Sequence, residues 1–430
     1  MQKHSGIFAC LLTAGLLTQS AFATNGYSPT GFGTINKGLA GAGVALPQDS
    51  MAAATNPAGM AVVGHRWDAG AALFSPSKRG YTADDNASPG APFVTAGDYI
   101  SDNDLFLIPH FGWNRQLTET STLGVSVGGN GGMNTEYDSA VFANFYNPLN
   151  PNSSPATSPT GVNFEQLFVG VTYALEVAQN NWFGVMPIIA VQRFEATGLE
   201  PFAGLSTNPS KVSNNGVDTV WGYGVRLGWL GKLNQKLSIG VSYQSRLNMD
   251  EFDKYAGLFA EQGDFDTPST WVVGLVYGIS PEVSLVLDYQ RINYGEINSL
   301  ANSNGLPLTG PSDFLGADGG LGFGWQDMNI IKLGVQWVFD DRLTLRAGYS
   351  HASELFKGTQ ALFNVLAPAT IRDHLSLGSS YQYNKQSAFN LAFTLALNEE
   401  IDGSSPFTAG QTGSVQMEQW ELEINWSHRF

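Results

Sequence analysis

The sequence predicts an all-β fold: a transmembrane antiparallel β-barrel of about fourteen strands with a short N-terminal hatch inside the lumen. Three observations lead to this prediction. Segments that alternate apolar and polar residues recur along the chain, and the connections between them alternate between short and long. The last of these segments keeps a strict period of two up to the terminal Phe430. A terminal strand with one apolar, aromatic face needs an apolar surface to lie against, and lipid provides one.

Residues 1–23 have the features of a secretory signal peptide. Lys3 gives a positive start, residues 7–17 are apolar, and a small-x-small cleavage site ends at Ala23, so the mature chain would begin at Thr24. The only cysteine, Cys10, has too little apolar sequence before it for lipoprotein processing. The mature chain therefore has no thiol, which excludes disulfides and cysteine-ligated metals.

The charge balance argues against nucleic acid as a partner. The chain carries 37 Asp and Glu but only 21 Lys and Arg, whereas phosphate binding needs clustered cations. Beyond the signal peptide, no apolar run reaches the roughly 18–20 residues that a spanning helix requires. A closed barrel is then the remaining way to cross a membrane, because every backbone amide in lipid must be paired. We therefore expect the protein in the bacterial outer membrane.

The barrel is expected to occupy residues 65–430. Short connections rich in turn-forming residues, such as 117–120 and 339–342, alternate with long polar loops, such as 144–162 and 299–324. In outer-membrane barrels the side with the short turns is periplasmic. The predicted strands comprise residues 66–78, 104–117, 120–130, 163–178, 181–198, 216–231, 235–250, 268–279, 282–297, 325–339, 342–353, 371–384, 386–400 and 416–430.

A soluble β-sandwich or propeller is the competing prediction. Such a fold would have to bury strand faces that are almost entirely apolar, although the opposite faces of the same strands are small and polar. This split favours lipid outside and a polar lumen inside. Two apolar faces are Ile331/Leu333/Val335/Trp337/Phe339 and Phe389/Leu391/Phe393/Leu395/Leu397, and Lys332/Gly334/Gln336 lie opposite the first.

Residues 24–64 do not fit the barrel. They are rich in glycine, too irregular for strands and too short for a separate plug domain. A disordered periplasmic tail is one interpretation, but the apolar stretches 45–47, 51–54 and 60–63 favour an ordered segment. We expect this segment to enter the lumen as a small stopper.

Two stretches of this segment, GLAGAGVALPQDS (38–50) and AAATNPAGM (52–60), resemble the hatch of the FadL/TodX family. These are outer-membrane transporters for long-chain fatty acids and other hydrophobic compounds. The resemblance implies a barrel plugged by the hatch, a capture groove on the third and fourth extracellular loops, and an inward kink of the third strand that opens the wall sideways. The hatch motif corresponds to Asn56, Pro57 and Ala58, where the Asn56 amide can bond exposed backbone such as a kinked strand leaves.

The kink corresponds to Gly128, Gly129, Asn130, Gly131 and Gly132. Glycine within a strand marks bulges and places where another backbone approaches closely, which favours a kink. The alternative interpretation is that the strand ends here and a loop begins.

The third and fourth predicted extracellular loops carry candidate capture residues. The second group has helical spacing, which would give one apolar stripe. A stripe that only packs the loops together is equally consistent with the pattern. The candidates are Phe202, Leu205, Phe252, Tyr255, Leu258 and Phe259.

Enzyme signals are weak. Residues 124–128 match G-x-S-x-G, but they lie in a predicted strand and not at the strand-to-helix turn that a nucleophile needs. The histidines have no metal-ligand spacing, so we expect no catalysis, no cofactor and no metal. The titratable residues of the lumen are expected to form an internal network: Arg226, Asp288, Arg346, Glu421, Glu423 and Arg429.

The resulting functional hypothesis is passive transport of hydrophobic molecules by a monomeric barrel. Its partners would be these small molecules, outer-membrane lipid and, during biogenesis, the β-barrel assembly machinery, for which Trp426, His428 and Phe430 would form the signal. An aqueous porin for polar solutes is the first alternative, although an open pore needs no stopper. A structural or adhesive barrel is the second.

Overall fold

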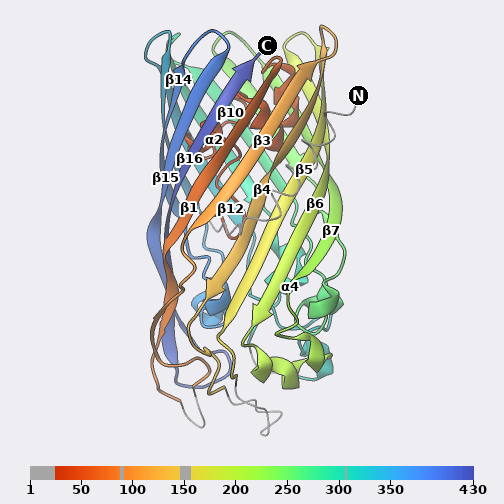
Figure 1. Cartoon of the computed structure of the whole chain (residues 1–430), viewed down its shortest axis with the longest axis vertical. Coiled ribbons are helices and arrows are strands. Elements are labelled where there is room, and N and C mark those ends of the chain that lie inside the picture. Colours follow the sequence, from red (N-terminus) through yellow and green to blue (C-terminus); the bar gives the residue numbers. More distant parts are fainter. Residues whose placement is uncertain (1–24, 88–91, 146–155, 306–307) are drawn as a thin grey trace.

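The computed structural model describes residues 25–87, 92–145, 156–305 and 308–430, so the predicted signal peptide lies outside the described residues. The chain forms a closed antiparallel barrel of fourteen strands, as predicted (Figure 1). β1 pairs with β16 and thereby closes the barrel. The barrel strands are β1 (Arg66–Ala83), β3 (Phe106–Gln116), β4 (Ser121–Glu136), β5 (Gly161–Ala178), β6 (Asn181–Thr197), β7 (Asp218–Lys232), β8 (Leu237–Gln244), β10 (Thr270–Gly278), β11 (Val283–Ile292), β12 (Met328–Val338), β13 (Leu343–Ala352), β14 (Asp373–Gln382), β15 (Ser387–Ser404) and β16 (Thr412–Arg429).

Strand lengths differ from the prediction at the end that carries the long loops. β4 runs through the glycine-rich stretch to Glu136, because a bulge between Gly129 and Gly131 lets its pairing with β5 continue. β8 ends earlier than predicted, because the chain folds back there and Leu247 bridges to Thr267. Two short strands extend the sheet: β2 (Gly97–Ile100) pairs with β1, and β9 (Asn248–Met249) pairs with β7.

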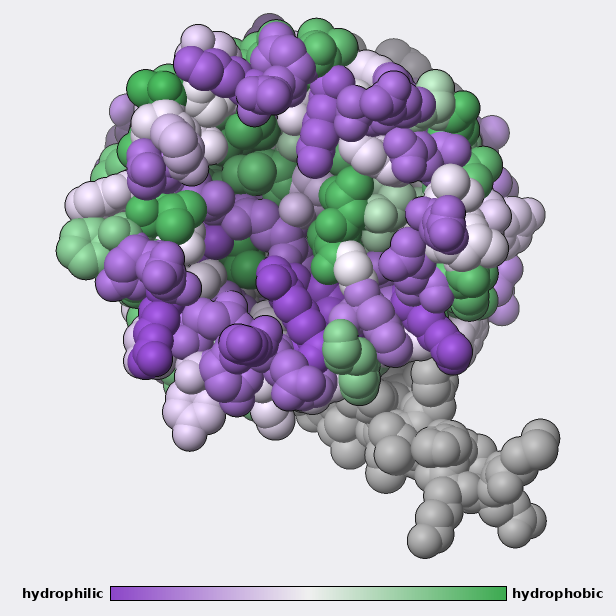
Figure 2. All heavy atoms as spheres, turned by 90° about the horizontal axis from the view of Figure 1, so that it is seen from above, coloured by the Kyte–Doolittle hydropathy of each residue, from purple (hydrophilic) through white to green (hydrophobic). Residues whose placement is uncertain are grey.

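All short turns lie at the end of the barrel where the chain terminates, at the top of Figure 1. The long loops lie at the opposite end and carry short helices. Figure 2 looks onto the short-turn end, where hydrophilic residues cover most of the surface and chain atoms block the view down the barrel. The loop helices are η3 (Glu200–Leu205), η4 (Pro209–Lys211), η5 (Asp253–Tyr255), α3 (Ala260–Gly263), η6 (Tyr294–Glu296), α4 (Asn298–Ala301), η7 (Pro311–Asp313), η8 (Gly358–Gln360) and η9 (Asn364–Leu366).

The outer faces of the strands are apolar and the inner faces are polar. Ile331, Leu333 and Val335 of β12 are exposed, whereas Lys332 between them is buried. The same alternation along β15 exposes Phe389 and buries Asn390. None of the helices in the described residues has the length and apolarity needed to cross a membrane. The exposed apolar side chains of the strands form the outer surface of the barrel.

The N-terminal segment, residues 25–64, lies inside the barrel (Figure 1, red). It contains α2 (Thr34–Lys37), η1 (Ser50–Ala54) and η2 (Pro57–Ala61). α2 contacts β14, β15 and β16, whereas η1 and η2 contact β1 and the strands from β3 to β7. The segment thus reaches across the lumen from wall to wall.

Candidate functional site

The wall of the barrel changes at the glycine-rich part of β4. β3 pairs with β4 from Gln116 as far as His110, which lies opposite Gly128. Beyond that point, within the described residues, β3 pairs with β1 and β4 pairs with β5, but the two strands no longer pair with each other. The bulged residue, Asn130, is buried, and its Nδ2 donates to Gln166 Oε1 at 2.9 Å. The backbone ladder of the wall is therefore interrupted at the predicted kink.

The N-terminal segment seals this interruption through Tyr27. The Gly132 amide donates to the Tyr27 carbonyl at 3.1 Å. Gly131 has a φ of +127°, and a β-carbon placed there would lie 1.8 Å from the same carbonyl oxygen. Both the backbone conformation and the close approach thus require glycine at position 131.

The Tyr27 side chain occupies the centre of an aromatic box. It is fully buried, and the centroid of its ring lies 5.4 Å from that of Tyr294 and 5.5 Å from that of Phe164. Phe265 and Trp325 complete the box at 6.3 and 6.1 Å. The sequence analysis did not identify this role, and the available signal was weak: an aromatic residue just after the predicted cleavage site.

An apolar cavity lies on the loop side of this box. Three predicted capture residues line it: Phe202, Leu258 and Phe259. The other three, Leu205, Phe252 and Tyr255, are fully buried but do not line it.

The ring of Tyr255 packs at 4.8 Å from that of Phe194, and its hydroxyl donates to the Gly216 carbonyl. The predicted stripe therefore does both things: part of it faces the cavity and part packs the loops together.

The cavity also has lining residues that the sequence analysis missed. Phe323 and Phe363 come from later loops, at positions with no periodic pattern. Met133 comes from β4 itself, two residues beyond Gly131, and lies opposite Phe164 of the aromatic box. The apolar cavity thus directly adjoins the interrupted part of the wall.

The hatch motif lies away from the kink. Asn56 Oδ1 accepts from the Ala58 amide and caps η2, which has Pro57 in its first turn. Asn56 Nδ2 donates to the Val44 carbonyl at 2.8 Å and to the Trp229 carbonyl of β7 at 2.9 Å. The suggestion that Asn56 would bond backbone left open by the kinked strand is therefore wrong, because Tyr27 takes that place.

Buried charges hold the N-terminal segment at the short-turn end. Lys37 Nζ lies 2.6 Å from both Glu421 Oε1 and Glu423 Oε2 of β16. Burial lowers the pKa of Lys37, but the two carboxylates raise it by more than burial lowers it. The pKa of Lys37 therefore lies above its ordinary value. Thr34 Oγ1 donates to Glu423 at 2.7 Å. α2 is thus fixed by charge-assisted bonds on its β16 side.

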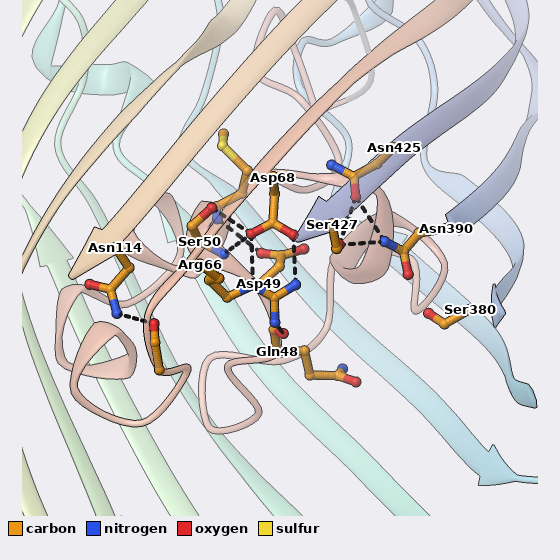
Figure 3. A network of polar contacts seen from close by, with 12 residues as sticks. Gln48, Asp49, Ser50, Arg66, Asp68, Asn114, Ser380, Asn390, Asn425 and Ser427 are labelled. Carbon is orange, nitrogen blue, oxygen red and sulfur yellow. Dashed lines mark hydrogen bonds and ion pairs between the residues drawn. The ribbon is translucent and has the colours of Figure 1, made fainter. Parts of the chain in front are cut away.

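A second group of bonds fixes the middle of the segment (Figure 3). Asp68 of β1 pairs with Arg66 at 2.6 Å and accepts from the Ser50 amide at 2.8 Å. Arg66 in turn donates to the Gln48 carbonyl. Close by, burial and the charge of Asp68 raise the pKa of Asp49 to about 7.

Strands on the other side of the barrel contribute further bonds. Asp288 accepts from the amides of Gly43 and Val44 at 2.7 and 2.9 Å, and Lys332 Nζ donates to the Thr30 carbonyl at 2.7 Å. Arg226 donates to the Ala54 carbonyl. Arg346 Nη2 donates to Gln48 Oε1. Arg226, Asp288 and Arg346, with Glu421 and Glu423 of β16, thus bond to the N-terminal segment as parts of the internal network that the sequence predicted. Lys332 is a further member that was not predicted, whereas the predicted member Arg429 is exposed.

The C-terminal residues lie where the barrel closes. The Phe430 ring stacks on His65 with the centroids 4.3 Å apart, and the Phe430 amide donates to the His65 carbonyl. His428 meets the Phe430 ring edge-on at 5.2 Å. Trp426 packs against Trp67 of β1 at 5.0 Å. The predicted assembly signal is thus also part of the β1–β16 seam.

Comparisons with known proteins agree with this architecture. The family model for outer membrane protein transport protein (OMPP1/FadL/TodX) matches residues 10–419. Outer membrane protein P1 of Haemophilus influenzae is 22% identical over 449 residues, covering 95% of this chain and 93% of its own.

Solved structures show the same fold. The toluene transporter TodX of Pseudomonas putida superposes with a TM-score of 0.67 at 18% identity, covering 95% of this chain and 100% of the other. A FadL homologue of Pseudomonas aeruginosa gives 0.67 at 14% identity, with 94% and 100% covered. The chain therefore belongs to the OMPP1/FadL/TodX family of outer membrane transport proteins.

Proposed function

We propose that the protein admits hydrophobic molecules passively, capturing them in the apolar cavity of the loops and releasing them sideways into the outer membrane at the β4 kink. One observation carries this proposal: Met133, just beyond the bulge, lines the same cavity as Phe202, Leu258 and Phe259. A molecule in that cavity lies next to the stretch of wall where β3 and β4 part, near the middle of β4. The related toluene transporter supports a hydrophobic cargo.

The energetics favour sideways release. An alkyl chain gains about 0.8 kcal/mol per CH₂ on leaving water, so releasing a sixteen-carbon chain into the periplasm would forgo on the order of 12 kcal/mol. A direct path would also cross the buried charges around Lys37 and Asp68. The inner faces of β1 and β3 next to the gap are apolar instead, with Phe74, Phe106 and Ile108 packed together.

The remaining roles belong to the same proposal. Residues 1–23 would direct export and be removed, and residues 24–64 would act as the hatch. Asn56, Pro57 and Ala58 would hold this hatch in place. Trp426, His428 and Phe430 would be read by the assembly machinery, and the mature barrel would work as a monomer without catalysis.

Paired transport assays test this function against the porin alternative. A strain that lacks the protein and the complemented strain are compared for uptake of a radiolabelled alkylbenzene and a radiolabelled long-chain alcohol. Purified protein in liposomes is tested for sugar-driven swelling. We expect uptake to depend on the protein and swelling to stay at the level of empty liposomes, because the N-terminal segment fills the lumen. Swelling without hydrophobe uptake would identify an aqueous pore.

A further inference from the structure

The lining of the apolar cavity contains no charged side chain among the described residues. Its single polar side chain is that of Ser299 in α4, and the Ser299 hydroxyl donates to the Asp264 carbonyl at 2.7 Å. A molecule in the cavity therefore meets carbon and aromatic edges but no free side-chain donor. An anion without a hydrogen-bond partner is strongly disfavoured in such surroundings.

The loop end of the barrel as a whole has the wrong charge for anions. Its seven long connections carry 18 Asp and Glu but only five Lys and Arg, of which Lys211, Lys357 and Arg372 lie in the connections that contribute Phe202 and Phe363. The connection from β8 to β10 carries Asp250, Glu251, Asp253, Glu261, Asp264 and Asp266 but only two cations. Both cations are engaged: Arg246 pairs with Asp264 at 3.0 Å and Asp266 at 2.5 Å, and Lys254 donates to the Val217 carbonyl. The connection from β1 to β3 adds five Asp and no Lys or Arg. This acidic rim repels an anion as it approaches.

The cations of the lumen lie elsewhere. Arg226 and Lys332 line a second cavity, which shares no lining residue with the apolar one. The aromatic box contacts the lining of both cavities. Phe265 of the box packs on Phe259 of the apolar cavity at 4.7 Å, and Tyr27 of the box precedes Ser28, which lines the second cavity. Both cations already donate to backbone carbonyls of the N-terminal segment. Within the described residues no Lys or Arg lines the apolar cavity, so a carboxylate held there has no cation among the lining side chains.

We infer that the apolar cavity selects uncharged hydrocarbons, such as alkylbenzenes, and rejects the carboxylate form of fatty or aromatic acids. This inference rests on the proposed function and names its substrate class. The lining has five phenylalanines, whose ring edges and faces suit an aromatic guest: Phe194, Phe202, Phe259, Phe323 and Phe363.

A matched pair of ligands tests the selectivity. Isobutylbenzene and phenylacetate have the same connectivity of non-hydrogen atoms, with two methyl groups in the first where the second has two carboxylate oxygens. Only phenylacetate is charged at neutral pH, because the pKa of a carboxyl group lies well below 7. Binding is measured at pH 7.5 by equilibrium dialysis against the full mature protein in lipid nanodiscs, with empty nanodiscs as the baseline. We expect a Kd for isobutylbenzene at least about tenfold lower than that for phenylacetate.

The outcomes separate the inference from the function on which it rests. Equal binding of the two ligands, or tighter binding of phenylacetate, would overturn the selectivity while leaving hydrophobe capture intact. Binding of neither ligand above the baseline would overturn both.

A variant pair tests the physical cause. Leu258 lines the cavity and is partly exposed, so a longer polar side chain can be accommodated there. Leu258→Lys places a cation at the cavity, and Leu258→Gln is the uncharged control. We expect Leu258→Lys to bind phenylacetate about tenfold more tightly than Leu258→Gln does. Equal phenylacetate binding by the two folded variants would contradict the charge argument.

Discussion

The two halves of the lumen are occupied by residues of different chemistry. At the loop end, the buried residues are aromatic and aliphatic, with Tyr27, Phe164 and Trp325 packed together. At the short-turn end, the N-terminal segment is held by ion pairs and directed hydrogen bonds, as between Lys37 and Glu421. A hydrophobic molecule can replace packing contacts in the first half, whereas it would leave charges unpaired in the second.

The N-terminal segment itself spans this difference. Its residues from Thr34 to Gly64 are fixed by strands around the barrel, among them Asn114 of β3, which donates to the carbonyls of Met60 and Gly64. Its first residues are held by neutral bonds from Gly132 to the Tyr27 carbonyl and from the Tyr294 hydroxyl to the Asn25 carbonyl at 2.5 Å and Ser28 Oγ at 3.0 Å, and by Lys332, which donates to the Thr30 carbonyl. No ion pair involves residues 25–33, so we expect the end beside the kink to move more readily than the rest of the segment.

The largest effect is expected at the kink. Gly131→Val adds a side chain that collides with the Tyr27 carbonyl and opposes the positive φ, so the gap is filled and the seal displaced. Uptake of an alkylbenzene at matched expression should fall at least about tenfold. Gly128→Ala on the same strand is the control, because its β-carbon has room 3.5 Å from the nearest atom, and it should stay within about twofold of the parent. Equal uptake by both variants would refute lateral exit at this strand.

A smaller effect is expected at the hatch motif. Asn56→Ala removes the cap of η2 and leaves the carbonyls of Val44 and Trp229 without this donor, a local cost of about 2 kcal/mol. Uptake should fall severalfold with near-normal barrel abundance. Asn56→Asp keeps the cap acceptor but cannot donate, and should be equally impaired if the two donated bonds matter. A loss of folded barrel that matches the loss of uptake would assign Asn56 a purely structural role.

The charged half should respond to pH. The pKa of Asp49 is raised to about 7 by burial and by Asp68, compared with about 3.9 for a free side chain. The folded protein therefore binds the proton on Asp49 more tightly than the unfolded chain does. The stability that this protonation contributes is complete below about pH 4 and is lost as the pH rises through 7. A spin label on Val63→Cys should be less mobile at pH 5 than at pH 8 by electron paramagnetic resonance. Asp49→Asn in the same background should flatten this change, and an identical pH response would exclude Asp49 as its source.

The smallest effect is expected at the seam. Deletion of Phe430 removes the stacking on His65 and the terminal aromatic, so the folded fraction in the outer membrane should fall about twofold by heat-modifiable gel mobility. Substrate binding by the folded fraction should not change. Unchanged assembly would count against a targeting role for this residue.

Sequence predicted the strands well because alternation is a local pattern that lipid on one side and lumen on the other impose directly. It also identified Phe202, Leu258 and Phe259 from their apolar character. It could not identify Tyr27 or Phe323, since their importance depends on contacts between residues that only barrel closure brings together. The partner of Asn56 was misassigned for the same reason.

One measurement tests sideways exit most directly. The β-carbon built at Gly334 of β12 lies 3.3 Å from the Cβ of Leu39, close to the roughly 3.5–4.5 Å that a disulfide spans, so Leu39→Cys with Gly334→Cys places a disulfide within reach in a mature chain that has no other cysteine. Oxidation would lock the N-terminal segment beside α2 to β12 but leave Tyr27 free. We expect hydrophobe uptake by the oxidised protein to stay within about twofold of that by the reduced protein. Uptake that is lost on oxidation and restored by reductant would mean that the cargo passes straight through the N-terminal segment, and would contradict lateral release.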